Sequence, residues 1–251
     1  MGKIIAVVNQ KGGVGKTTTA VNLTAALTEA GKKVLLCDFD PQANATSGLG
    51  VEKRKVNHSV YDVIIDGVDP EEALVQTAYG DVLPSSPDLA GAAVELLSME
   101  EPNYRLRSAL EAVRDRYDLI LIDCPPSLEL LTVNALAAAD GILVPVQCEY
   151  YALEGLADLM NTLRLIKKRI NPRLEIFGVV LTMFDGRTNF STQVAQEVRK
   201  HFPGKAFATV IPRNVRLAEA PSHGLPITAY DRSSKGGKAY KAIAEEIMKR
   251  I

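Results

Sequence analysis

Continuous apolar runs recur along this chain, and segments with helical spacing lie between them. The apolar runs, which show no polar alternation, occupy residues 4–8, 33–37, 117–123, 141–146, 177–182 and 207–211. Such runs are typical of parallel strands that are buried on both faces. Helical patterns occupy residues 16–30, 104–116, 128–139, 153–170 and 191–201. The alternation predicts an α/β fold with a doubly wound, mostly parallel sheet and helices on both of its faces.

Two further parts of the chain complete this picture. Residues 43–116 carry the weakest pattern, from which we expect short helices at 57–66 and 70–76 and a brief edge strand at 82–84. The last segment, 237–251, is predicted to be a docking helix because its apolar side chains share one helical face. Those side chains are Tyr240, Ile243, Ala244, Ile247 and Ile251.

A glycine-rich turn follows the first apolar run directly and opens the first predicted helix. Residues 9–19 are NQKGGVGKTTT. Strand, glycine-rich turn and helix N-terminus in this order form a phosphate cradle, in which backbone N–H groups and the helix dipole face the anion. Lys16 would then reach the β- and γ-phosphates, and the Thr17 hydroxyl would bind Mg²⁺. The alternative is a glycine-rich turn without a ligand.

The predicted nucleotide contacts of this turn are Gly12, Gly13, Val14, Gly15, Lys16, Thr17 and Thr18. The spacing departs from the common phosphate-loop pattern G-x-x-x-x-G-K-[ST] at one position. Gln10 stands where the first glycine is expected, and an additional lysine, Lys11, follows it.

Carboxylates follow two of the predicted strands. Asp38 and Asp40 come after the second apolar run, and Asp123 ends the third. The carboxyl ends of parallel strands border the ligand crevice of an open α/β sheet, so these side chains are candidates for the chemistry at the phosphates. Asp38 and Asp40 point to opposite sides if the strand continues, so we expect them to have different roles. Both could instead be turn-forming aspartates.

The pattern Lys-Gly-Gly-x-Gly-Lys-Thr resembles the deviant Walker A loop of the family that holds ParA/Soj partition ATPases, MinD, arsenite-pump ATPases and the nitrogenase iron protein. The resemblance to ParA/Soj extends over essentially the whole length. It implies that Lys11 reaches across a dimer interface to the partner's nucleotide. It also implies that Asp40 positions the attacking water, that Asp38 lies close to the metal, and that Asp123 holds Mg²⁺ through water as the Walker B aspartate.

The resemblance extends to residues far from the loop. It implies that Pro212 and Asn214 border the adenine of ATP, and that Arg187 and Arg216 face DNA. The resulting catalytic set is Lys11, Lys16 and Asp40, and the metal set is Thr17, Asp38 and Asp123. The cofactors implied are ATP and Mg²⁺.

Composition adds bounds on domain number and compartment. With 251 residues and 47% hydrophobic content, the chain can bury the core of one domain, which we place at 1–251. No apolar run approaches the roughly 18 residues that a membrane span needs, and a strand so near the N-terminus leaves no room for a signal peptide. Cys37, Cys124 and Cys148 adjoin apolar strands, which predicts buried free thiols in a reducing cytosol. Their spacing gives no support to a metal cluster.

The charge is distributed unevenly. Residues 1–163 hold 12 Lys and Arg against 23 Asp and Glu, a net charge of −11, whereas residues 164–251 hold 17 against 7, a net charge of +10. This asymmetry favours a polyanion-binding face in the C-terminal third. The excess could also be scattered over the surface, and the cations at 167–169 would suit a helix C-terminus.

The family resemblance implies a switch for chromosome or plasmid segregation, cytoplasmic and nucleoid-associated. An ATP-dependent homodimer would bind non-specific double-stranded DNA, and a ParB/Spo0J-type partner would stimulate hydrolysis. The alternatives are a MinD-like membrane-cycling ATPase that positions the division machinery, and a module that binds ATP without hydrolysing it. We expect no membrane binding, because the chain ends inside the last predicted helix and shows no amphipathic tail beyond it.

Overall fold

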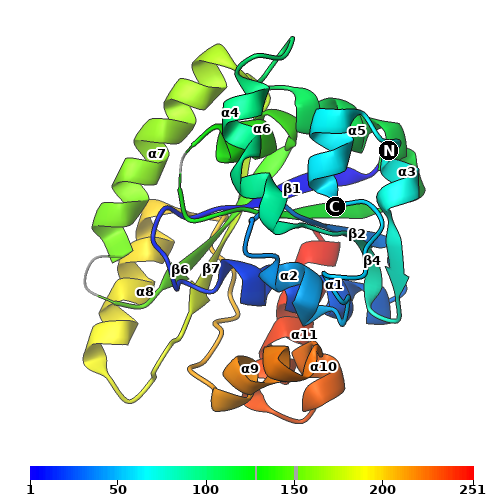
Figure 1. Cartoon of the computed structure of the whole chain (residues 1–251). Helices are drawn as coiled ribbons and strands as arrows, with labels where there is room; N and C mark the ends of the chain where they lie inside the picture. Colours follow the sequence, from blue (N-terminus) through cyan, green and yellow to red (C-terminus); the bar gives the residue numbers. More distant parts are fainter. Residues whose placement is uncertain (128, 150–151) are drawn as a thin grey trace.

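The computed structural model describes residues 1–127, 129–149 and 152–251. Its centre is a seven-stranded sheet with the order β3-β4-β2-β5-β1-β6-β7 (Figure 1). All neighbouring strands are parallel except β3 and β4. The strands are β1 Lys3–Val7, β2 Val34–Asp38, β3 Val75–Thr77, β4 Gly80–Leu83, β5 Leu119–Asp123, β6 Gly141–Gln147 and β7 Glu175–Thr182. The predicted fold class is confirmed.

Helices cover both faces of the sheet, as predicted. One face packs against α1, α2 and α11, and the other against α4, α5, α6, α7 and α8 (Figure 1). The longer helices are α1 Lys16–Glu29, α5 Arg105–Val113, α6 Leu130–Ala138, α7 Ala152–Arg169, α8 Asn189–His201 and α11 Lys235–Met248. The short α-helices are α2 Asn44–Gly48, α3 Pro70–Ala73, α4 Ala92–Leu96, α9 Val215–Glu219 and α10 Ile227–Tyr230. The predicted start of α6, at residue 128, lies outside the described residues.

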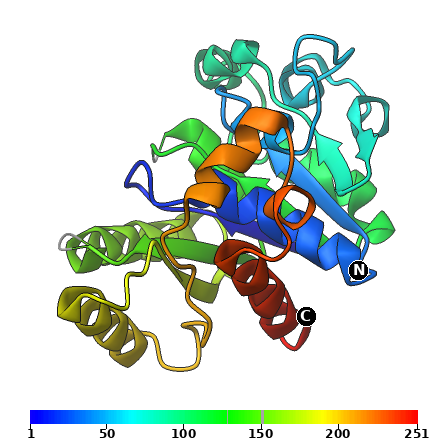
Figure 2. The same cartoon turned by 90° about the horizontal axis from the view of Figure 1, so that it is seen from below.

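Four short turns of other helix types connect these elements. They are the π-helix η1 Asp62–Asp66 and the 3₁₀ turns η2 Pro87–Ala90, η3 Arg114–Arg116 and η4 Ala220–His223. Figure 2 shows α11, in dark red, beside the blue helix α1, with the orange segment of α9 and α10 crossing the same side of the molecule. The prediction that residues 1–251 form one domain stays a prediction.

The middle of the chain differs from the prediction at three points. The helix predicted at 57–66 begins at residue 60, and most of it is the π-helix η1. The predicted helix at 70–76 ends at Ala73, and Val75–Thr77 forms β3, which pairs antiparallel with β4. The edge strand is therefore β3, and β4 lies inside the sheet between β3 and β2. Gly80 makes this hairpin possible, because its φ is +124° and a Cβ there would lie 2.8 Å from a methyl carbon of Thr24.

The predicted strand at 207–211 was also wrong. No residue of it is in a strand: isolated bridges flank it at Ala206 and Pro212, and its Phe207 and Ile211 N–H groups donate to β7 carbonyls at 3.0 and 2.8 Å. Between them, the backbone N–H groups of Ala208 and Thr209 each donate to the Glu246 carboxylate at 2.9 Å. A side chain of α11 thus takes donors that a regular strand would direct into the sheet.

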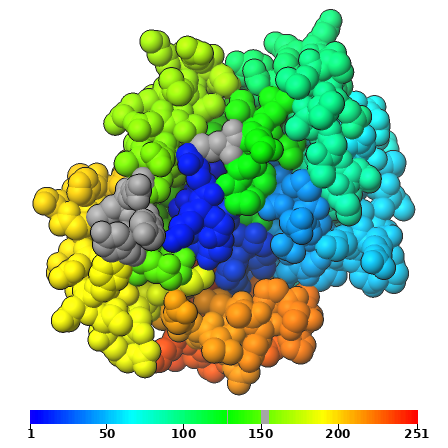
Figure 3. All heavy atoms as spheres, turned by 60° about the vertical axis from the view of Figure 1, so that its left-hand side comes forward, coloured from blue at the N-terminus to red at the C-terminus, as the bar shows by residue number. Residues whose placement is uncertain are grey.

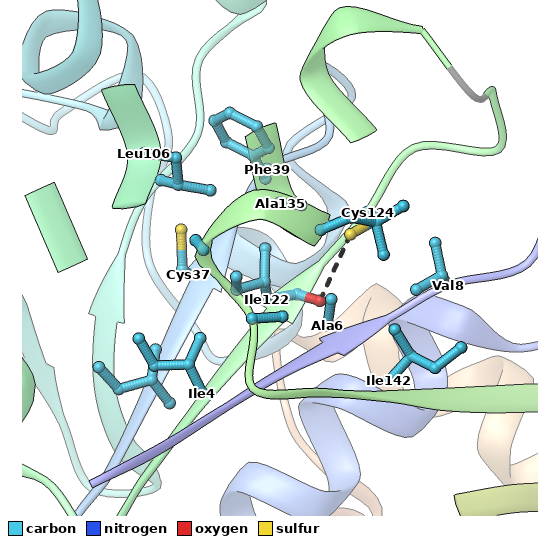
Figure 4. Packing of buried hydrophobic residues seen from close by; sticks show 14 of the residues in the cluster. Ile4, Ala6, Val8, Cys37, Phe39, Leu106, Ile122, Cys124, Ala135 and Ile142 are labelled. Carbon is cyan, nitrogen blue, oxygen red and sulfur yellow. Dashed lines mark hydrogen bonds between the residues drawn. The ribbon is translucent and has the colours of Figure 1, made fainter. Parts of the chain in front are cut away.

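The core consists of two clusters of buried apolar residues, one on each side of the sheet. In Figure 4, Cys37 and Cys124 lie among Ile4, Ile122 and other core side chains. All three cysteines are free and buried, as predicted. The predicted apolar face of the last helix is confirmed except at Ile251, which lies beyond the helix and is 40% exposed. None of the described helices has the length and apolar character needed to cross a membrane.

Candidate active site

The glycine-rich turn lies between β1 and α1, at the carboxyl edge of the sheet. Gly13 and Gly15 take φ values of +74° and +91°, and Gly15 is the residue that precedes α1. These left-handed conformations are strained for residues with a Cβ, which explains the glycines. Figure 3 shows the dark blue turn exposed at the middle of this face, so a ligand can approach it from solvent.

Hydrogen bonds to β6 and from β7 hold the turn in place. The Asn9 amide donates to the Pro145 carbonyl at 2.7 Å, and the Asn9 side-chain oxygen accepts from the Lys11 N–H at 3.0 Å. The Thr182 hydroxyl at the end of β7 donates to the Val14 carbonyl at 2.8 Å. The turn is therefore preorganised by β6 and β7 as well as by its own glycines.

Lys16 is the buried cation of the site. It is 7% exposed, and its ammonium donates to the Lys11 carbonyl at 3.3 Å. Burial lowers the pKa of Lys16, while the nearby Asp123, Cys124 and Asp40 raise it. Among the described residues no carboxylate lies within ion-pair distance of its ammonium. A phosphate in the cradle would supply the missing anion.

Asp38 and Asp123 are paired residues on the neighbouring strands β2 and β5, and both are fully buried. The Asp38 carboxylate accepts hydrogen bonds from the Thr46 N–H at 2.6 Å and from the Thr46 hydroxyl at 2.7 Å. Burial raises the pKa of Asp38 to about 6 despite these bonds. Burial and the neighbouring Asp38 charge also raise the pKa of Asp123 well above its ordinary value.

The oxygens of Asp123 have no hydrogen-bond partner among the described residues. Thr17 and Lys16 lie close enough to lower the pKa of this carboxyl group, although the Thr17 hydroxyl does not reach hydrogen-bond geometry. A buried carboxylate without a partner is costly. A hard divalent cation, held by carboxylate and hydroxyl oxygens, would remove this cost, so the donor set fits Mg²⁺.

Asp40 lies two residues after Asp38 and is only partly buried. Its N–H donates to the Asp38 carboxylate at 3.3 Å, and its own carboxylate accepts from the Gln42 N–H at 2.9 Å. The Ser85 hydroxyl, which follows β4, donates to the Asp40 carbonyl at 2.8 Å. The loop that carries Asp40 is thus tied both to the buried carboxylate and to the next strand.

A pocket of about 350 Å³ adjoins the turn. Pro212 and Asn214 line it together with Gly15 and Thr18, which places the two predicted adenine contacts beside the phosphate cradle. The Asn214 side chain also caps α9, accepting from the Arg216 N–H at 2.8 Å. The buried Tyr240 of α11 forms another part of the wall, with its hydroxyl 3.2 Å from the Thr19 hydroxyl. A pocket of this volume and largely apolar lining suits a purine.

Lys11 lies at the surface of the turn, where its ammonium is 3.6 Å from the Glu149 carboxylate. Arg213 approaches the same carboxylate at 3.8 Å. The sequence reasoning missed Glu149, although it follows β6 at the same edge of the sheet as the other carboxylates. It also missed Thr46, Thr182 and Tyr240, whose roles depend on tertiary contacts and leave no local pattern.

Arg187 and Arg216 lie outside the pocket, and each forms an exposed ion pair with a neighbouring carboxylate. Two nitrogens of Arg187 donate to the Asp185 carboxylate at 2.9 and 2.7 Å. Arg216 contacts Glu219 at 2.8 Å and Asp231 at 3.6 Å. The side chain of Arg187 is 88% exposed, so this pair contributes little to stability.

Known proteins resemble this chain over most of its length. A family model described as "AAA domain" matches residues 2–176. The sporulation initiation inhibitor protein Soj of Bacillus subtilis is 57% identical over 98% of both chains. The chromosome-partitioning ATPase Soj of Thermus thermophilus is 53% identical over 98% of this chain and 96% of its own. The crystal structure of cobyrinic acid a,c-diamide synthase from Mycobacterium smegmatis with bound ADP and magnesium has a TM-score of 0.86 and 38% identity, and it covers 99% of this chain and 95% of its own.

Proposed function

Because the chain belongs to the Soj/ParA family of chromosome-partitioning ATPases, we propose that it is an ATP-dependent switch for chromosome or plasmid segregation. ATP hydrolysis changes its state rather than making a product for another enzyme. The observation that carries this proposal is the grouping of buried Lys16, Asp38 and Asp123 around one glycine-rich turn. These groups leave charges that a nucleotide and its metal would neutralise.

The chemistry is in-line attack of water on the γ-phosphate of ATP. The N–H groups of residues 12–18 and the Lys16 ammonium bind the phosphates and stabilise the charge that develops on them. Thr17, Asp38 and Asp123 are the groups that would hold Mg²⁺, which neutralises phosphate charge when it is bound. Asp40 orients the attacking water, and Pro212 and Asn214 border the adenine.

The active state is an ATP-bound dimer in which the nucleotide-bearing faces of two protomers meet. The exposure of the turn on this face supports the arrangement, because the turn lies at the surface, where a partner can contact it (Figure 3). Lys11 leaves Glu149 and reaches the partner's nucleotide. Their contact in one protomer is a half-exposed ion pair at 3.6 Å, which costs little to break.

The ATP-bound dimer binds double-stranded DNA without sequence preference. The net charge of +10 in residues 164–251 supports this, since contacts to phosphates supply most of non-specific DNA affinity. Arg187 and Arg216 belong to this part of the chain, and DNA phosphates compete with their acidic neighbours. A dimer presents each arginine twice, which makes the binding depend on ATP. A ParB/Spo0J-type partner stimulates hydrolysis and release, and the protein works in the cytoplasm on the nucleoid.

The test is a gel shift with unrelated duplexes in the presence of ATP, ADP or no nucleotide. We expect binding with ATP and much weaker binding in the other two conditions. Lys16→Ala is the control, since it removes the cation over the phosphates and should abolish the effect of ATP. Equal affinity of the wild-type protein in all three conditions would reject the proposed switch.

A further inference from the structure

The short helix α4 carries an exposed apolar surface within an acidic environment. Val94 and Leu97 are 75% and 71% exposed and lie one helical turn apart at the end of α4. Glu95 lies between them, and Glu100 and Glu101 follow in the exposed loop that leads to α5. We call these five residues the α4 surface. Figure 1 shows α4 at the top of the molecule, at the outside of the helix layer.

The segment that contains the α4 surface is acidic, and the nearest cations in the sequence are Lys55 before it and Arg105 after it. Residues 56–104 hold ten aspartates and glutamates and neither lysine nor arginine. Among the described residues, none of the three glutamates of the α4 surface forms an ion pair. Such a long stretch of one sign of charge creates a negative field over the exposed Val94 and Leu97.

Residues of η1 and η2 add further negative charge near the α4 surface. The Tyr61 hydroxyl donates to both oxygens of Glu95 at 3.1 Å. That hydrogen bond raises the pKa of Tyr61, and burial and the charges of Glu95, Asp66 and Asp88 raise it further. The nearest arginine in the chain, Arg105, donates to the Ile64 carbonyl of η1 at 3.0 Å and forms no ion pair with Glu95, Glu100 or Glu101, so these carboxylates favour a positively charged partner.

The α4 surface is connected to the active site through one short segment. Ser85 follows β4, and η2 and α4 come next in the chain. The Ser85 hydroxyl donates to the Asp40 carbonyl at 2.8 Å, and its N–H donates to the Thr46 hydroxyl at 3.0 Å. Buried Leu89, Ala92 and Leu96 anchor η2 and α4 to the core. A displacement of α4 can therefore be transmitted to the backbone of Asp40, the residue proposed to orient the attacking water.

We propose that the α4 surface docks a partner segment that carries apolar side chains and lysines or arginines on one face. This rests on the proposed function, because the segment belongs to the partner that stimulates ATP hydrolysis. Val94 and Leu97 supply the apolar contact, and Glu95, Glu100 and Glu101 pair with the cations. Docking shifts the segment of Ser85 and, through its hydrogen bond, the position of Asp40.

The first experiment measures ATP hydrolysis with DNA as the ParB/Spo0J-type partner is titrated. The test variant is the double substitution Val94→Ser and Leu97→Ser. Leu165→Ser is the matched control, because Leu165 is also exposed (58%) but lies on α7. We expect unchanged basal hydrolysis and unchanged thermal unfolding in both variants. The partner concentration for half-maximal stimulation should rise about tenfold or more in the double variant only, as for the loss of an interface hot spot.

A second experiment keeps the two proposals separable. A labelled 15-residue amphipathic peptide of leucines and lysines is titrated against the full chain by fluorescence anisotropy. We expect salt-sensitive binding that Val94→Ser with Leu97→Ser weakens, and that Glu100→Gln with Glu101→Gln also weakens. If the wild-type protein binds the peptide in this way but the partner does not stimulate it, the partner role in the proposed function fails and the surface stands.

Two results would overturn the proposed surface. One is stimulation of both the wild-type protein and the double variant with the same half-maximal partner concentration, or equal peptide binding by both. The other is self-association of the nucleotide-free protein that the double variant loses, measured by sedimentation, since the basic third of a second copy would then be the occupant.

Discussion

Thr46 holds the buried carboxylate of Asp38 with two hydrogen bonds, from its N–H at 2.6 Å and from its hydroxyl at 2.7 Å. The same hydroxyl accepts a hydrogen bond from the Ser85 N–H at 3.0 Å. One side chain on α2 thus joins the end of β2 to the end of β4. The position of Asp38, and of the loop with Asp40 that follows it, depends on this link.

Replacing Thr46 by valine tests the link. Thr46→Val keeps the shape of the side chain but removes the hydroxyl, which leaves a buried carboxylate with one strong donor fewer. We expect the free energy of unfolding to fall by roughly 1.5–3 kcal/mol, the range for a hydrogen bond to a charged group. Urea denaturation measures it, and Thr46→Ser, which keeps the hydroxyl, should retain most of the stability. Equal losses in both variants would assign the effect to packing.

The pKa of Asp38 predicts a dependence of stability on pH. Because this pKa is raised from 3.8 to about 6, the neutral form is favoured in the folded state. The stabilisation by Asp38 is therefore present below about pH 4 and is lost as the pH rises through about 6. Asp38→Asn, studied without nucleotide or Mg²⁺, should gain stability relative to the wild type over this window, by up to about 3 kcal/mol. A difference that does not change with pH would contradict the assigned environment.

Asp40→Ala should separate ATP binding from hydrolysis. The phosphate cradle remains whole in this variant, so ATP binds, but the water is no longer oriented and turnover nearly stops. We expect an ATP-locked dimer, measured as normal ATP affinity with a loss of phosphate release. Lys16→Ala is the contrasting variant, in which ATP affinity itself is lost. Wild-type turnover in Asp40→Ala would reject the role given to this residue.

The sequence was sufficient for the sheet and the phosphate cradle because both depend on local patterns. Apolar runs mark buried strands, and Gly13 and Gly15 are needed where the backbone has positive φ. The same logic placed Asp38 and Asp123 at one edge of the sheet. It failed at 207–211, where Glu246 from α11 takes two backbone donors. The pattern of an apolar segment does not indicate a hydrogen-bond partner that lies some 40 residues away in the sequence.

In the candidate site too, residues that follow a local pattern could be predicted and residues placed by distant contacts could not. The residues of the turn could be named from their spacing, but Thr46, Thr182 and Tyr240 could not. Each of these contributes a single hydroxyl that reaches the site only after distant elements pack. Pro212 and Asn214 were placed by the family resemblance, and the pocket that they line joins the ends of several elements.

Gly12→Val should leave ATP binding intact and prevent dimer formation. A Cβ at Gly12 would meet no described atom of its own chain within 4 Å, and the residue does not have a positive φ. The fold therefore tolerates valine there, whereas the proposed partner backbone must approach closely. Sedimentation with ATP should show monomers. Gly15→Val is the control for damage to the cradle itself, because its φ of +91° strains any side chain and should reduce ATP affinity. A dimer of normal affinity in Gly12→Val would mean that the turn does not form the interface.

The arginine pairs give the last prediction. Hydrogen bonds from Arg187 lower the pKa of Asp185 to about 2, so this carboxylate is ionised throughout the working range and competes with DNA phosphate for the guanidinium. Arg187→Ala and Arg216→Ala should each weaken binding to random-sequence duplexes in ATP and reduce the slope of log K against log salt by about one.

Asp185→Asn should have the opposite effect, because it removes the competing charge and leaves Arg187 free for phosphate. The gain in affinity should be the same at pH 6 and pH 8, since Asp185 titrates at about pH 2, far below both. Fluorescence anisotropy across a salt series, with sedimentation to show that each variant remains dimeric, measures all three variants. If both arginine variants keep wild-type affinity and slope while dimeric, Arg187 and Arg216 serve only their surface ion pairs, and DNA binds to another part of the basic third of the chain.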